Sequence, residues 1–165
     1  MDEVEAAKVG TVSLWVRPVA AIAAGYLADR TSAGLMTIVS FALLASGSLV
    51  LGIGTIQSWM LGIYLLTIIC ASLGIFALRG LYFAIMKEGN VPVAFTGSAV
   101  GLVSVVGYTP DIFMGPVMGY LLDSSPGPVG HQHVFLMVFG FAIIGLGASV
   151  LFSHITRKKR NAAIA

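Results

Sequence analysis

The chain has 165 residues, of which 58% are hydrophobic and only 10% are charged, and its formal net charge is +2. A soluble domain usually carries about 25% charged residues, and a disordered segment combines low hydrophobicity with high charge, so this composition excludes both classes. A membrane-spanning helix needs about 20 apolar residues. With a mean hydropathy of +0.97, the chain has room for roughly five such spans.

Apolar runs separated by turn-forming clusters predict five transmembrane segments. The expected segments cover about residues 11–28, 33–53, 59–86, 94–122 and 134–155. Strands of a membrane barrel are only about ten residues long and alternate in polarity, whereas these runs are continuously apolar and about twice that length, so helices are expected. The predicted fold class is therefore an all-α, polytopic membrane protein.

The Lys and Arg residues outside these segments lie almost entirely on one side of the predicted bundle. Arg30 follows the first segment, Lys87 the third, and residues 157–160 the fifth, while only Lys8 falls on the opposite side. Cytoplasmic loops carry an excess of Lys and Arg, so the N-terminus is expected outside and the C-terminus in the cytoplasm. The predicted organisation is an extracytoplasmic tail (1–10), a five-helix bundle (11–157) in the plasma membrane (the cytoplasmic membrane of a bacterium) and a cytoplasmic tail (158–165).

The fourth segment contains two pairs of glycines at the spacing typical of close helix packing in membranes. Gly97 and Gly101 form one pair, and Gly115 and Gly119 form the other. Small residues at this spacing let two helix backbones approach closely. The pattern predicts tight packing of this helix, and a set of sliding interfaces is the alternative.

Three ionisable residues lie inside predicted segments, where a charge costs about 2.5–3.5 kcal/mol on insertion scales. Arg17 and Arg79 are candidate substrate-binding residues, because a guanidinium offers a planar fork to a carboxylate or phosphate. A structural ion pair or extension of the side chain to the membrane surface is the alternative for both. Asp111 is a candidate proton-coupling carboxylate, with an ion pair to Arg17 or a cap at the outer helix end as alternatives.

Two prolines adjoin these charges: Pro18 follows Arg17, and Pro110 precedes Asp111. A proline inside a helix removes one backbone hydrogen bond, and freed carbonyls at membrane depth are tolerated where they line a cavity. The coincidence predicts helix breaks beside a solute path, and kinks needed only for packing are the alternative.

The sequence carries no signature of an enzyme or of a cofactor site. It has no nucleophile–base pair and no phosphate-binding or zinc-protease motif, and its single cysteine, Cys70, excludes an internal disulfide. His131 and His133 are a weak metal signal in an outer loop. We therefore expect no catalysis, no cofactor and no metal. Nucleic acid is not an expected partner either, because basic and aromatic residues are not interleaved.

The junction of the first two segments resembles a loop signature of the major facilitator superfamily. It reads Gly25-Tyr26-Leu27-Ala28-Asp29-Arg30, and two later stretches, Arg79 to Ala84 and Gly107 to Asp111, also resemble late helices of that family. The signature is incomplete, because Ser32 stands where a second glycine is expected. The resemblance implies helices eight to twelve of a twelve-helix transporter, that is, part of a six-helix half.

The same resemblance implies a role for the junction and for the charged residues. Gly25, Asp29 and Arg30 would form a gating motif at the cytoplasmic side, and the three ionisable residues would lie on cavity helices. The expected function is secondary active transport of a small polar solute by ion-coupled alternating access. The arginines favour an anionic solute. Expected partners are the lipid bilayer, the solute and either the missing N-terminal helices or another copy. The alternatives are a non-transporting scaffold or assembly partner, or an inactive truncated product.

Overall fold

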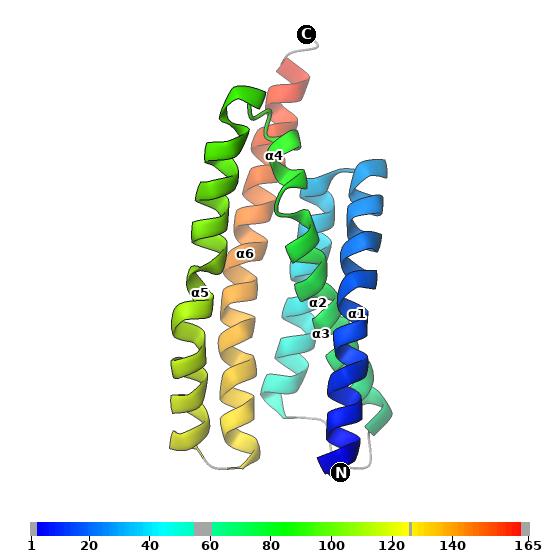
Figure 1. The fold of residues 1–165 in the computed structure, drawn as a ribbon, viewed down its shortest axis with the longest axis vertical. Coiled ribbons are helices and arrows are strands. Elements are labelled where there is room, and N and C mark those ends of the chain that lie inside the picture. The colour runs from blue at the N-terminus through cyan, green and yellow to red at the C-terminus, as the bar shows by residue number, and fades with distance from the viewer. Residues whose placement is uncertain (1–2, 55–60, 126, 163–165) are drawn as a thin grey trace.

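The structure, a computed structural model, describes residues 3–54, 61–125 and 127–162. These residues form helices that run up and down beside one another, without a strand among them (Figure 1). In chain order they are α1 (Glu3–Arg30), α2 (Ala33–Ile53), α3 (Leu61–Leu81), α4 (Ala84–Glu88), the short 3-10 helix η1 (Val93–Phe95), α5 (Thr96–Ser124) and α6 (Pro128–Ala162).

Four regions within the described part of the chain are long and apolar enough to cross a membrane. They are Ala33–Ile53, Gly62–Leu81, Val93–Ser124 and Pro128–Arg157. The chain is therefore an all-helical, multi-pass membrane protein, but the expected count of five spans is not confirmed. The run expected as one segment over 59–86 contains α3 and, after a turn at Tyr82 and Phe83, the separate helix α4. The α1 helix begins at Glu3, within the stretch expected to be a tail.

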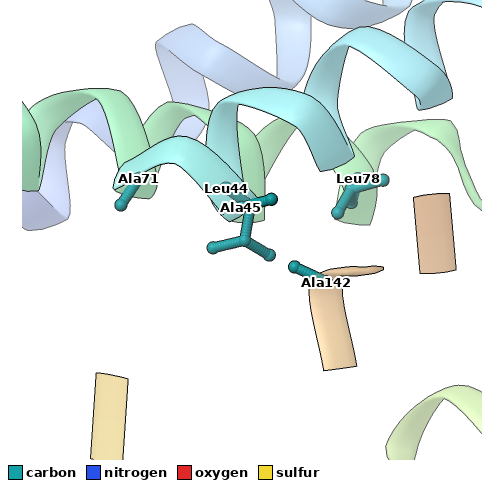
Figure 2. Close-up of a cluster of buried hydrophobic side chains, with 5 residues drawn as sticks. All are labelled: Leu44, Ala45, Ala71, Leu78 and Ala142. Carbon is teal, nitrogen blue, oxygen red and sulfur yellow. The ribbon is translucent and has the colours of Figure 1, made fainter. Parts of the chain in front are cut away.

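Helix α2 lies at the centre of the packing, against α3 on one side and α6 on the other, while α1 packs on α3. Figure 2 shows the main buried cluster, which these helices build from small and aliphatic side chains. Its members are Leu44, Ala45, Ala71, Leu78 and Ala142. A second cluster joins α1, α2 and α3 near the α1–α2 turn, where Leu81 is completely buried. Alanine-rich contacts of this kind let helices approach closely.

The closest approach between α2 and α3 is made at glycines. A Cβ atom on Gly74 would lie 2.7 Å from the Ser40 carbonyl oxygen, and one on Gly47 would lie 2.9 Å from the Ala71 Cβ. In contrast, no described atom lies within 4 Å of the corresponding position on Gly97, Gly101, Gly115 or Gly119. Among the described residues, the tight packing expected for the paired glycines of α5 is therefore absent, and it occurs at the α2–α3 crossing instead.

Two side chains satisfy the exposed backbone N–H groups at the start of α2. The hydroxyl of Ser32, the N-cap residue, accepts a hydrogen bond from the Leu35 N–H at 3.0 Å. The Glu88 carboxylate, at the end of α4, accepts one from the Gly34 N–H at 2.7 Å. A negative charge at a helix N-terminus also interacts favourably with the helix dipole. These contacts tie the α1–α2 turn to α4, which follows 54 residues later.

Candidate functional site

Arg79 of α3 and Asp111 of α5 face each other in the structure. The Arg79 Nη2 atom lies 3.8 Å from the Asp111 Oδ1 atom, and the two side chains are 41% and 62% exposed. At 3.8 Å the two groups attract as charges but lie beyond the usual hydrogen-bond distance. The sequence analysis singled out both residues. It named Arg17 as a possible ion-pair partner of Asp111, but in the structure that partner is Arg79.

Asp111 lies near the middle of its helix. It follows Thr96, the first residue of α5, by 15 positions, which is about 22 Å along a helix. Since the hydrocarbon core of a bilayer is about 30 Å thick, a carboxylate at this position lies at membrane depth. A charge there is costly unless it meets a partner or water, and Arg79 is that partner.

A partly open cavity of about 280 Å³ is lined by residues of α2, α3, α4, α6 and the turn after α3, and neither Arg79 nor Asp111 belongs to its wall. Three aromatic side chains form much of its wall, namely Phe41, Tyr82 and Phe152. The hydroxyls of Thr37 and Ser149 also line it, but each donates to the carbonyl four residues earlier in its own helix, at 2.7 Å. The wall therefore presents an almost entirely apolar surface.

Tyr82 lies between the cavity and α5. Its side chain lines the cavity, and a Cβ atom on Gly107 of α5 would lie 3.4 Å from the Tyr82 Cε2 atom. Gly107 lies one helical turn before Asp111, and Tyr82 lies three residues after Arg79. Helix α5 therefore meets the end of α3 and the turn after it at two places, Arg79 with Asp111 and Tyr82 with Gly107.

The other residues predicted for the site lie elsewhere or outside the described side chains. Arg17 belongs to α1, but its side chain lies outside the described residues. Pro18 and Pro110 lie inside helices that continue on both sides of them. The expected breaks are therefore not interruptions of the helices, because a single proline removes only one N–H donor.

The residues expected to gate the cytoplasmic side lie at the end of α1. Asp29 and Arg30 are exposed, and the Arg30 guanidinium carbon lies 4.6 Å from the centre of the Tyr26 ring. No described atom lies within 4 Å of a Cβ position on Gly25. The carboxylate that accepts a hydrogen bond at the N-terminus of α2 belongs to Glu88, a residue that the sequence analysis did not single out. Its partner is 54 residues away, so no local pattern could have indicated the contact.

Two curated proteins of Escherichia coli (strain K12) are similar to parts of this chain. Inner membrane protein YqcE is 37% identical over 71 residues, which are 43% of this chain and 16% of that protein. Inner membrane protein YihN is 36% identical over 87 residues, which are 52% of this chain and 21% of that protein. The chain therefore spans about a fifth or less of the length of these relatives. No family model matches the chain, and no solved structure matches it.

These comparisons overturn the expected membership of the major facilitator superfamily. The relatives are named only as inner membrane proteins, and they do not point to a fragment of a major facilitator transporter. The resemblance rested on three short stretches, and in the first of them Arg30 stacks on Tyr26 near the end of α1. The gating role of Gly25, Asp29 and Arg30 was implied by that resemblance alone and loses its support.

Proposed function

We propose that this chain belongs to an inner membrane transport protein that moves a small organic anion by ion-coupled alternating access. The Arg79–Asp111 pair carries the proposal. Both charges lie on membrane helices, and both side chains are substantially exposed rather than sealed in the core. Charged residues inside membrane segments usually mark substrate or ion pathways.

The geometry of the pair favours a binding role over a purely structural one. Structural ion pairs are strongest when a guanidinium holds a carboxylate through two parallel hydrogen bonds. Arg79 and Asp111 are 3.8 Å apart at their nearest atoms, so the planar fork of Arg79 remains available for a second carboxylate. In this proposal Arg79 binds the anion, and Asp111 is the counter-ion that holds Arg79 when the site is empty.

The distribution of basic residues supports an N-terminus outside and a C-terminus in the cytoplasm. Arg30 ends α1, Lys87 lies in α4, and Arg157 lies near the end of α6, so the alternating helices bring all three to one end of the bundle (Figure 1). Under the positive-inside rule this end faces the cytoplasm. A cysteine introduced at Lys87 in a Cys70→Ser background should react with an impermeant maleimide only after the membrane is opened. Labelling of this cysteine in intact cells would contradict the proposed orientation.

Uptake by liposomes that contain the purified chain tests the proposed transport. Labelled succinate, gluconate and 3-phenylpropionate would each be measured against protein-free liposomes. We expect uptake of at least one anion above that background, a loss of about tenfold or more in Arg79→Gln, and partial retention in Arg79→Lys, which keeps the charge but not the fork. Equal uptake by the original chain and by Arg79→Gln would contradict a role of Arg79 in binding. A stable, correctly inserted chain with no uptake of any probe would favour a non-transporting scaffold.

A further inference from the structure

Helix α5 exposes two faces of different chemistry. Small and polar residues at alternating spacings of four and three positions share one side of the helix, namely Gly97, Gly101, Ser104, Tyr108, Asp111 and Gly115, and all but Ser104 are exposed. The opposite side exposes large apolar residues, namely Leu102, Val106, Phe113 and Val117. The apolar face suits lipid. The face with Asp111 suits water or protein, because a charge exposed to hydrocarbon at membrane depth is costly.

Few titratable groups surround Asp111. The elements around it contribute Arg79 of α3, at 3.8 Å, Tyr82 of the following turn and Tyr108 of α5 itself. In α6, which packs on α5, residues 134–153 include no titratable side chain, and η1 has none either. The described side chains around Asp111 therefore bring it one cation and no second carboxylate.

The ion pair determines how the charge of the site changes when an anion binds. Arg79 and an ionised Asp111 together carry no net charge. A carboxylate bound to Arg79 beside an ionised Asp111 would make the site negative, and two like charges that share one site disfavour each other. A proton on Asp111 removes this repulsion and restores neutrality. The anion and the proton therefore favour each other's binding, by the same factor in both directions.

A single exposed carboxylate suits a proton better than a metal cation. A proton needs one carboxylate oxygen and contact with water, and the Asp111 side chain is 62% exposed. Hard metal cations such as Ca²⁺ take several oxygen ligands, and the described residues contain no group of three or more His, Cys, Asp or Glu side chains that could hold one. Proton binding forms one O–H bond on the Asp111 carboxylate, and release returns that proton to water.

We propose that Asp111 is the binding site of the coupling ion, that this ion is a proton, and that one proton on Asp111 travels with each anion on Arg79. This inference rests on the proposed transport function and names the ion that drives it. After both have left, the ionised Asp111 pairs with Arg79 again, so the empty site returns through the membrane without net charge.

Calorimetric titration of the purified chain in lipid nanodiscs measures the coupled proton directly. Succinate, gluconate and 3-phenylpropionate are each titrated near neutral pH, in two buffers of different ionisation enthalpy, and heats from empty nanodiscs are subtracted. The difference between the buffers gives the number of protons taken up with each bound anion, and we expect close to one. Binding without proton uptake would overturn the inference. Binding of none of the three probes would overturn the anion site as well.

The substitution Asp111→Asn should separate anion binding from proton uptake. The amide keeps the size of the side chain but carries no exchangeable acidic proton, so the variant should bind the anion without proton uptake. It should bind several-fold more tightly, because no carboxylate competes for Arg79. Asp123→Asn is the matched control, since Asp123 lies in the last turn of the same helix, and proton uptake should be unchanged. Proton uptake that persists in Asp111→Asn would overturn the role of Asp111.

A conservative variant covers the case in which Asp111→Asn does not fold, as judged by circular dichroism. Asp111→Glu keeps a carboxyl group at this position and should retain proton uptake, although its longer side chain changes the distance to Arg79. Loss of proton uptake in a folded Asp111→Glu variant that still binds the anion would contradict the proposal.

Uptake into liposomes tests whether the proton drives transport. With the membrane potential held at zero by potassium and valinomycin, an inward gradient of about one pH unit should accumulate succinate or gluconate up to about tenfold, because one proton enters with each anion. In Asp111→Asn the same gradient should give no accumulation, while exchange of labelled for unlabelled anion continues. Accumulation driven by a sodium gradient and not by a pH gradient would overturn the proton as the coupling ion.

Failure of this inference is distinguishable from failure of the proposed transport. Arg79-dependent uptake that does not respond to the pH gradient would overturn proton coupling and leave transport standing. Proton uptake on anion binding, without uptake of any anion into liposomes, would overturn transport and leave the coupled binding site standing.

Discussion

The α2–α3 crossing and helix α5 both contain glycines, but these glycines have opposite surroundings. Backbone atoms of α2 lie within 3 Å of a Cβ position on Gly74, whereas no described atom lies within 4 Å of one on Gly101. Helix α5 packs mainly on α6 and has no buried residue, while α2 is buried along much of its length. The comparison teaches that the spacing of small residues indicates where helices can approach, while the fold decides where they do.

The strongest test of this comparison is a matched pair of Gly→Ala substitutions. Gly74→Ala should destabilise the chain, because overpacking costs about 1–3 kcal/mol and exceeds the helix-propensity gain of about 0.5–1 kcal/mol. Gly101→Ala should stabilise it by about that gain, because the added methyl group meets nothing. Unfolding in dodecyl sulphate mixed micelles, followed by circular dichroism, gives both free energies. A loss of stability in Gly101→Ala would show that α5 is packed more tightly than the structure indicates.

A smaller effect is expected where charged side chains meet the helix ends. Glu88→Gln keeps an acceptor for the Gly34 N–H but removes the charge at the α2 N-terminus, so it should cost about 0.3–1 kcal/mol. Asp123→Asn, in the last turn of the loosely packed α5, is the matched control and should not destabilise, because an acidic residue near a helix C-terminus is unfavourable. Equal losses of unfolding free energy in Glu88→Gln and Asp123→Asn, measured by the same assay, would contradict the expected difference between the α2 N-terminus and the end of α5.

The sequence was most informative about α2. The expected second segment and α2 both cover residues 33–53, because Ser32 is a strong N-cap residue and Gly54 takes the left-handed conformation, with a φ of 67°, that ends the helix. The turn between α3 and α4 was not predicted, since Tyr82 and Phe83 are apolar aromatic residues that continue the hydrophobic run. Local residue chemistry signals a helix end only where a cap or breaker stands there.

The candidate site was predictable only as separate residues. Arg79 and Asp111 are conspicuous because each is a charge in an apolar run, but they are 32 positions apart, and only the fold brings α3 beside α5 at this point. The cavity could not be predicted, because its walls come from α2, α3, α4 and α6. The resemblance to a major facilitator transporter rested on three short stretches, at the end of the first segment, from Arg79 to Ala84 and from Gly107 to Asp111, and the comparisons do not support it.

The two hydrogen bonds at the start of α2, accepted by Ser32 and Glu88, form at different times during synthesis of the protein. Gly34 leaves the ribosome 54 residues before Glu88, the residue that accepts its hydrogen bond. During synthesis the start of α2 therefore depends on Ser32 and on water or lipid headgroups to satisfy its free N–H groups. The Glu88 carboxylate replaces that solvent only after α3 has entered the membrane and α4 has docked, so the start of α2 reaches its final form late in biogenesis.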